Sequence, residues 1–320
     1  MGKFRNLIGI GLSYTVSRVT GDVVHWGKPV SVSLEPVNRC NLGCTECPAG
    51  RHTLTRPRGT MSQALFNSAL DQLLPELAYA TLYFQGEPYL HPGFTEMARE
   101  AGKRGLYTAS STNGHFLDAE SARETVHSGL DRLIVSIDGY DQESYAAYRA
   151  GGSLAKVVGG IKALAEAKRN MRSRKPYIVA QCLLLSTTQD RQEEVRKLAR
   201  EAGADRVEFK TAQFCDFENG HPLMPEERYS RYRKDARTGR YVIKNPLRNG
   251  CFRMWSSCVI TWDGLVVPCC YDKDAAHVMG DLNRQSFAEI WNGEKYREFR
   301  KKILHDRKSV DICQNCTQRF

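Results

Sequence analysis

Short runs of β-branched and aromatic residues alternate with longer helix-type segments along most of this chain. The expected strands are residues 31–35, 81–84, 106–111, 132–137, 177–185 and 206–210. The expected helices are residues 62–74, 95–103, 119–128, 153–170 and 190–201. Such alternation is typical of βα units that build a parallel sheet. The pattern therefore predicts an α/β fold, a partial (βα)6 TIM-like barrel.

Capping residues support these helix bounds. Ser62 and Asp118 stand where an N-cap is expected, and Gly102, Gly105, Gly129 and Gly203 fall at expected helix ends. In βα barrels the reactive groups gather at the carboxyl ends of the strands. The residues that follow each strand are therefore the candidates for function.

Composition sets outer limits on the class of protein. With 320 residues, 41% of them hydrophobic, the chain can build one large domain and a small one. Its 11 cysteines come in tight groups, which favours metal binding in a reducing compartment over a disulfide framework. We expect a cytoplasmic protein.

The net charge and the N-terminus carry weaker signals. A formal charge of +10 suits an acidic partner, but a solvated basic surface is the favoured explanation. The apolar run at residues 7–12 is too short to span a bilayer. We expect a helix packed on the barrel there, with an interfacial helix as the alternative, and we expect no stable nucleic-acid or membrane partner.

Three thiols follow the first expected strand. Cys40, Cys44 and Cys47 can bind three irons of a [4Fe–4S] cluster, which normally takes four cysteines. One iron would then lack a protein ligand and stay open for chemistry. The alternative is a structural zinc site, which needs a fourth ligand such as His52.

A second group of cysteines surrounds a hairpin signal near the C-terminus. Asp263-Gly264 stands between two β-rich arms, and the thiols around it are Cys251, Cys258, Cys269, Cys270, Cys313 and Cys316. Adjacent strand residues point to opposite faces, so Cys269 and Cys270 should not serve one cluster together. If Asp263-Gly264 forms a two-residue turn, Cys258 lies directly across from Cys269. Four such thiols can bind a whole cluster or a zinc ion.

Polar residues also stand where the expected strands end. They are Gln85, Gly86, Glu87 and Pro88 after the second strand, Thr112 and Asn113 after the third, and Ser136 and Asp138 after the fourth. Gln181 lies within an apolar strand, where a buried amide needs hydrogen-bond partners. These groups suit a nucleoside ligand, although Ser, Asn and Asp also cap ordinary loops.

These motifs together resemble the radical S-adenosylmethionine (SAM) superfamily. The resemblance implies that Cys40, Cys44 and Cys47 hold the cluster whose open iron binds SAM. It implies that the Gln85–Pro88 segment receives the SAM amino group, and that Ser136 and Arg149 hold its carboxylate. Thr112, Asn113, Asp138 and Gln181 complete the implied SAM site. Two residues depart from the family pattern, Gln85 in place of a glycine and Glu46 in place of an aromatic residue.

The C-terminal region resembles the SPASM and shortened twitch extensions of that superfamily. Cys251, Gly264 and Cys269 match the family spacing, whereas Cys258 lies too close to the glycine. The implied ligands of an auxiliary [4Fe–4S] cluster are Cys251, Cys269, Cys313 and Cys316, with Cys258 in reserve. Too few cysteines remain for a second auxiliary cluster.

The predicted organisation has four parts. Residues 1–28 form an N-terminal helical segment and residues 29–215 the radical SAM partial barrel. Residues 250–320 form the auxiliary extension, a small β-hairpin plus helix. Residues 216–249 carry many basic side chains between Pro, Gly and Asn, which indicates a linker or lid, by default a solvated helix.

The resemblance implies an enzyme that cleaves SAM to a 5′-deoxyadenosyl radical and takes a hydrogen from its substrate. The auxiliary cluster would then accept an electron, giving a two-electron oxidation, or would only shape the pocket of a redox-neutral enzyme. A small molecule and a peptide both fit as substrate, and flavodoxin or ferredoxin as electron donor. The alternative is a non-catalytic iron–sulfur or zinc protein with structural clusters.

Overall fold

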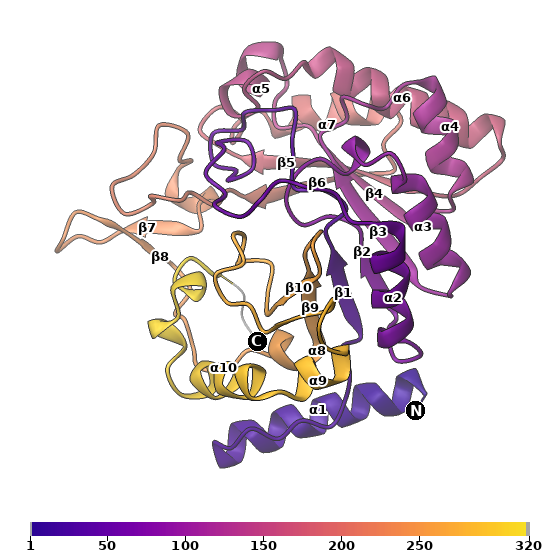
Figure 1. Cartoon of the computed structure of the whole chain (residues 1–320). Coiled ribbons are helices and arrows are strands. Elements are labelled where there is room, and N and C mark those ends of the chain that lie inside the picture. The colour runs from indigo at the N-terminus through magenta and orange to yellow at the C-terminus, as the bar shows by residue number, and fades with distance from the viewer. Residues whose placement is uncertain (1, 318–320) are drawn as a thin grey trace. The chain divides into compact units, whose positions relative to one another are not determined.

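The computed structural model describes residues 2–317 (Figure 1). These residues divide into two compact units. The terminal unit contains residues up to Arg39, Leu54–Thr108 and the chain from Leu247 onward, and the central unit contains Cys40–Thr53 and Ala109–Pro246. The fold class predicted from the sequence, α/β with a mainly parallel sheet, is confirmed.

The sheet of the terminal unit joins the start of the chain to its end. Its order is β11 (Gly280–Asp281), β10 (Leu265–Val267), β9 (Ser257–Ile260), β1 (Ser31–Leu34) and β2 (Tyr79–Thr81). Strand β1 pairs in parallel with β2 on one side and with β9 on the other (Figure 1). The C-terminal hairpin thus continues the sheet that the first strand begins.

The turn of this hairpin differs from the two-residue turn considered above. Val266 pairs with Ile260, and the Thr261 amide donates to the Leu265 carbonyl at 2.9 Å, so three residues, 262–264, form the loop. Gly264 has a φ of +91°, the left-handed conformation that such a loop requires. Continuing the register places Cys258 opposite Pro268. The two-residue turn that would have placed Cys258 across from Cys269 is therefore not formed.

Helices of the terminal unit are α1 (Lys3–Thr20), α2 (Gln63–Leu73), α3 (Phe94–Lys103), α8 (Arg253–Ser256), α9 (Phe287–Asn292) and α10 (Glu294–His305), with short 3-10 turns η1 (Pro88–Leu90), η3 (Arg307–Ser309) and η4 (Asp311–Cys313). The Tyr14 ring of α1 packs edge-on against Trp255 of α8, with centroids 5.1 Å apart. The side of α1 that faces the protein buries Asn6, Ile10, Ser13 and Ser17, while Phe4, Leu7, Ile8 and Leu12 are exposed. No helix within residues 2–317 has the length and apolarity needed to cross a membrane.

The central unit carries four parallel strands in sequence order. They are β3 (Tyr107–Thr112), β4 (Arg132–Ser136), β5 (Tyr177–Leu184) and β6 (Arg206–Thr211). Its helices are α4 (Ala119–His127), α5 (Gln142–Tyr148), α6 (Leu154–Asn170) and α7 (Gln192–Glu201). Because parallel strands share their direction, the residues that follow β3, β4 and β5 meet at one edge of the sheet.

Two local expectations differ from the structure. Strand β2 begins and ends earlier than residues 81–84, because its register with β1 pairs Ser31 with Tyr79 and Ser33 with Thr81. Helix α5 was not expected from the sequence. It begins with a capping box in which the Asp141 side chain accepts from the Ser144 amide at 2.8 Å.

The basic segment forms a hairpin in place of the expected solvated helix. Strands β7 (Tyr232–Lys234) and β8 (Tyr241–Ile243) pair antiparallel, after a short turn η2 (Glu227–Tyr229). The Asp235 amide donates to the Arg240 carbonyl, and Gly239 adopts a φ of +70° between the strands. The hairpin forms because Tyr232 on one arm can be completely buried, which a solvated helix would not allow.

Candidate functional site

The cysteine loop in the central unit is held by the end of the unexpected helix α5 and the turn that follows it. The Gly43 amide donates to the Ala150 carbonyl at 2.9 Å, and the Thr45 amide donates to the Tyr148 carbonyl at 3.2 Å. These main-chain bonds fix the loop without using a thiol. Cys40, Cys44 and Cys47 also form no disulfide, so their thiols are available as ligands.

Nitrogen donors surround two of these thiols. Cys40 Sγ accepts from the Leu42 amide at 3.5 Å and from Asn113 Nδ2 at 3.8 Å. Cys44 Sγ accepts from Arg149 Nη1 at 3.5 Å. Burial raises the pKa of the Cys44 thiol, and the Arg149 guanidinium acts in the opposite direction. Donors and a cation directed at sulfur suit thiolates that bind a cluster.

Asp138 and Arg149 form a buried ion pair beside this loop. Arg149 Nε lies 2.6 Å from Asp138 Oδ2, and the other carboxylate oxygen accepts from the Leu183 amide at 2.6 Å. Ser136 ends β4 opposite Gln181 of β5 in the strand register. The structure therefore brings Ser136, Asp138, Arg149 and Gln181 to one region of the central unit, and it engages Arg149 with Asp138 and Cys44.

The other predicted residues of the central unit differ in whether their side chains already form hydrogen bonds within the protein. Thr112 Oγ1 accepts from the Gly114 amide, and Asn113 Oδ1 accepts from the His115 amide, both at 3.0 Å, which is the loop-capping role. Gln181 Oε1, in contrast, is buried without a hydrogen-bond partner in the described structure. Because an unpaired buried acceptor is costly, Gln181 fits a ligand that donates a hydrogen bond there.

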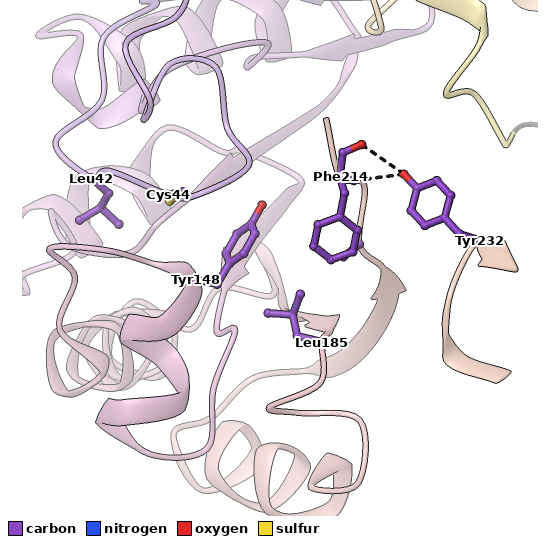
Figure 2. Close-up of a cluster of buried hydrophobic side chains, with 7 residues drawn as sticks. Leu42, Cys44, Tyr148, Leu185, Phe214 and Tyr232 are labelled. Atoms are coloured by element: carbon purple, nitrogen blue, oxygen red, sulfur yellow. Dashed lines mark hydrogen bonds between the residues drawn. The ribbon is translucent and has the colours of Figure 1, made fainter. Parts of the chain in front are cut away.

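An apolar cluster includes two residues of the cysteine loop (Figure 2). It contains Leu42, Cys44, Tyr148, Leu185, Ala212, Phe214 and Tyr232. The Phe214 amide donates to the Tyr232 hydroxyl at 3.1 Å, drawn as a dashed line in Figure 2. This cluster anchors the β7–β8 hairpin and the cysteine loop on the same core.

Glu46 has a role that the sequence did not suggest. It stands where the radical SAM superfamily usually has an aromatic residue, and it is buried. Glu46 Oε2 accepts from the Cys215 amide at 2.6 Å, and Oε1 lies 3.4 Å from His221 Nε2. The position of this carboxylate directly before Cys47 was the only sequence signal for the contact.

The Gln85–Pro88 loop lies in the terminal unit. Gly86 has a φ of +77°, and a Cβ there would come within 2.5 Å of the Val37 carbonyl oxygen. The Glu87 amide donates to the Arg39 carbonyl at 2.8 Å, and the Glu87 carboxylate caps η1, which Pro88 begins. Gln85 Oε1 is buried without a hydrogen-bond partner in residues 2–317. The loop is therefore rigid and offers one unused buried acceptor.

The four cysteines predicted to bind the auxiliary cluster line one cavity of the terminal unit. Cys251 precedes α8, Cys269 follows β10, Cys313 ends η4, and Cys316 follows it. The Cys316 thiol accepts from the buried Arg307 side chain at 3.3 Å, and the Cys269 thiol accepts from the Tyr271 amide at 3.3 Å. A cationic, donor-lined pocket with four thiols suits an anionic iron–sulfur cluster.

These thiols must lose protons to bind metal. Burial raises the pKa of Cys251 and raises that of Cys313 to about 11, while Arg307 acts in the opposite direction on both. Among the described residues, no group of three or more His, Cys, Asp or Glu side chains is arranged to hold a single metal ion. A zinc ion needs all of its ligands around one point, whereas each iron of a cubane cluster binds its own thiolate, so the thiols can stand farther apart.

A second, larger cavity of about 590 Å³ lies in the same unit. Its wall contains Gln85 of the loop described above, and Cys269 and Arg253, which also line the four-cysteine cavity. Cys258 and Cys270 line the large cavity and are absent from the described lining of the smaller one. A volume of this size is typical of a site for a small organic ligand.

The sequence held an unused signal for this cavity. Ser31, Ser33, Tyr79 and Thr81 alternate with apolar residues on β1 and β2, and all four line the cavity. Strands of a parallel sheet that is covered on both faces normally read as continuous apolar runs. Polar residues at alternate positions therefore indicate a hollow or wet face.

Two family models match the chain. The radical SAM superfamily model covers residues 34–199, and the model of the SPASM iron–sulfur cluster-binding domain covers residues 251–317. The first match spans more than half of the 320 residues, so the chain belongs to the radical SAM superfamily, and it carries a SPASM domain. It is accordingly an enzyme that uses a [4Fe–4S] cluster and SAM, with auxiliary iron–sulfur binding at its SPASM domain.

Curated relatives cover most of the chain at modest identity. The chain is 28% identical to a tungsten-containing aldehyde ferredoxin oxidoreductase cofactor-modifying protein of Pyrococcus furiosus, over 89% of this chain and 86% of the relative. It is 25% identical to an AdoMet-dependent heme synthase of Methanosarcina barkeri, over 85% of each. It is 26% identical to a PqqA peptide cyclase of Xanthomonas campestris, over 91% of this chain and 80% of the relative.

Solved structures share the fold. BtrN in complex with AdoMet and 2-DOIA superimposes with a TM-score of 0.55 at 18% identity, covering 93% of this chain and 94% of that one. Streptococcus suis SuiB bound to its precursor peptide SuiA gives a TM-score of 0.66 at 11% identity, covering 91% and 70%.

Proposed function

We propose that this enzyme completes a two-electron oxidation of its substrate, with Cys40, Cys44 and Cys47 holding the SAM cluster and Cys251, Cys269, Cys313 and Cys316 holding one auxiliary cluster. With its cofactors bound, the protein would obtain a 5′-deoxyadenosyl radical for hydrogen removal and an acceptor for the second electron. The substrate would lose one hydrogen atom, then one proton and one electron.

One observation carries this proposal. The large cavity is bounded by Gln85, from the loop implied to bind SAM, and by Cys269, implied to bind the auxiliary cluster. A substrate in this cavity would therefore stand next to the loop implied to bind SAM and next to a cysteine implied to hold the electron acceptor. Arg253 and Cys269 line both this cavity and the four-cysteine cavity.

The protein's own groups would position and shield the reactants. Gln181 offers its unpaired buried Oε1 to a ligand in the central unit, and Gln85 does so in the terminal unit. The Asp138–Arg149 pair directs a guanidinium to Cys44, which supports the thiolate form. The relatives include a peptide cyclase and a heme synthase, so a peptide and a small molecule both stay open as substrates. Flavodoxin or ferredoxin would supply the external electron.

The test begins with anaerobic reconstitution and counting of iron and sulfide. Two cubanes predict about eight irons per chain. Incubation with SAM and dithionite should give 5′-deoxyadenosine, and mass spectrometry of a converted substrate should show the loss of two hydrogens. Bound zinc without SAM cleavage would identify a non-catalytic protein. SAM cleavage with a product of unchanged redox state would show that the enzyme is redox-neutral.

A further inference from the structure

The large cavity of the terminal unit is lined by two basic side chains and, among the residues that the structure describes, by no carboxylate. The two basic side chains are those of Arg253 and Lys273. A cavity wall with two cations and no carboxylate attracts an anion. Arg253 also lines the four-cysteine cavity, so it would face both a cluster there and a ligand here, whereas Lys273 lines the large cavity alone.

Neither cation is neutralised by a neighbouring carboxylate. Arg253 Nη1 lies 3.4 Å from Cys270 Sγ, and within residues 2–317 neither Arg253 nor Lys273 forms an ion pair. The acids on either side of Lys273 are used elsewhere. Asp272 accepts from the amides of Ala276 and His277, and Asp274 accepts from the amide and hydroxyl of Thr55.

The backbone that carries these two side chains is firmly placed. Arg253 begins helix α8, directly after Cys251 and Phe252. The Lys273 carbonyl accepts from Arg56 Nε at 3.3 Å, and Arg56 is itself held by a two-pronged pair with the buried Glu35. A guanidinium and an ammonium set on rigid backbone can meet a carboxylate with little loss of entropy.

The other side chains that line the cavity indicate the chemistry of the rest of the ligand. Hydroxyl side chains come from Ser31, Ser33, Thr81, Ser256 and Ser257, and aromatic rings come from Tyr79, Tyr83, Phe84 and Phe252. Alternation on β1 and β2 turns the polar residues to one face of the sheet. Such a wall suits a ligand with an apolar or aromatic body that carries hydroxyl groups.

We infer that this cavity binds a substrate bearing a carboxylate, with Arg253 and Lys273 as the residues that select for the negative charge. The inference rests on the proposed function, since it assigns a substrate class to the same cavity. The carboxylate belongs to a free organic acid or to an acidic side chain of a peptide, and the shared chemistry is its charge. Arg253 thereby holds the substrate next to Cys269.

Matched ligand pairs that differ only in charge test the inference. The first pair is 4-hydroxyphenylacetate and 4-hydroxyphenylacetamide, chosen for the aromatic and hydroxyl lining. The second is a blocked Gly-Glu-Gly tripeptide and its Gly-Gln-Gly counterpart. Affinities would be measured by anaerobic calorimetry on the reconstituted enzyme with SAM and without reductant, so that no turnover occurs. We expect the acid of at least one pair to bind at least about tenfold more tightly than its amide.

Variants of the two basic residues test whether they cause this preference for the acid. Arg253→Gln and Lys273→Gln should each reduce the preference severalfold, and the double variant should abolish it. Arg253→Lys should restore part of it, which a purely structural role would not do. Lys301→Gln, an exposed lysine of α10 that removes the same charge, should leave the preference unchanged. Iron content measured for each variant would show that the cluster beside Arg253 is intact.

The outcomes separate this inference from the proposed function. Equal affinity of acid and amide in both pairs overturns the inference, as does a preference that survives in the double variant. The pair that shows the larger preference identifies the source of the carboxylate. SAM cleavage without a charge preference rejects only the substrate class, whereas a charge preference without SAM cleavage rejects only the proposed reaction.

Discussion

Arg149 bridges Asp138 and Cys44 within the central unit. Its guanidinium pairs with the Asp138 carboxylate at 2.5 Å and approaches the Cys44 thiol at 3.5 Å. The resemblance to the superfamily assigned Arg149 to the SAM carboxylate, and this contact network adds a structural partner on each side. The ion pair therefore fixes the direction of a cation at the cysteine loop.

Asp138→Asn should be strongly destabilising. The Asp138 side chain is 1% exposed, and its loss would leave the largely buried guanidinium of Arg149 without its counter-ion. Removing one partner of a buried pair costs about 3–5 kcal/mol of unfolding free energy. Chemical denaturation of wild type and variant, under identical anaerobic conditions, measures this difference.

Glu208→Gln is the matched control for that variant. Glu208 pairs with Arg132 at 3.1 Å in the same unit, but both side chains are 20% or more exposed. Its loss should cost less than about 1 kcal/mol, because exposed pairs contribute little. Similar costs for the two variants would show that the Asp138–Arg149 pair is not specially buried or coupled.

Alanine variants of the C-terminal cysteines should differ in the amount of iron that they bind. Cys269→Ala should lower the iron of the reconstituted enzyme from about eight to about four per chain. Cys258→Ala and Cys270→Ala should keep nearly all of it, since both thiols line the large cavity and are absent from the described lining of the four-cysteine cavity. If Cys258→Ala lost half of the iron and Cys269→Ala did not, the ligand assignment would have to be exchanged.

The same Cys269→Ala variant tests the role of the auxiliary cluster. It should still form 5′-deoxyadenosine from SAM, because its SAM-cluster cysteines are unchanged. It should not release the oxidised product, because the second electron then has no acceptor. Chromatography of both products from one reaction measures this split, and an undiminished yield of oxidised product would contradict the electron-acceptor role.

Gly86→Ala should disrupt the loop implied to bind SAM. The added Cβ would lie 2.5 Å from the Val37 carbonyl oxygen at a φ of +77°, so the loop must shift. We expect SAM affinity to fall at least about tenfold, measured by equilibrium dialysis, with a loss of stability above about 1 kcal/mol.

Gly102→Ala provides the control for this glycine. It lies in helix α3, and a Cβ there would meet nothing within 4 Å. Alanine in a helix should stabilise the protein by about 0.5–1 kcal/mol and leave SAM affinity unchanged. Unaltered SAM binding in Gly86→Ala would remove this loop from the SAM site.

His25 should make stability depend on acid pH. Burial, with Arg300 as a second cause, lowers the pKa of His25 to about 3. The unfolded chain protonates this imidazole near pH 6.5, whereas the folded chain keeps it neutral. Stability is therefore lost as pH falls below about 6.5, by about 2 kcal/mol between pH 7 and pH 5.

A His25→Phe variant isolates that contribution. Its ring can keep the edge-on packing against Trp291 while removing the titrating nitrogens. The stability loss between pH 7 and pH 5, measured by denaturation, should be smaller than in wild type by about 2 kcal/mol. His127→Gln, at an exposed position, should change nothing. Equal pH dependence of wild type and His25→Phe would contradict the assigned pKa.

Local patterns predicted most helix and strand positions because each is settled by neighbouring residues. Ser62 accepts from the Leu65 amide and Asp118 forms a capping box, both within one helical turn. The thiol spacing at Cys40–Cys47 likewise lies within one loop, so the sequence alone suffices to recognise it. The family matches then confirm the radical SAM class and the SPASM domain.

Only the tertiary structure decided relationships between distant residues. The sequence could not show that β9 pairs with β1, that Glu46 binds the Cys215 amide, or that Arg253 shares a cavity wall with Gln85. The hairpin register that separates Cys258 from Cys269 depended on one extra loop residue. Spacing determines which ligands a loop can offer, because that is a matter of chain geometry over a few residues. Which side chains surround a ligand depends on packing between segments hundreds of residues apart, and no local pattern encodes it.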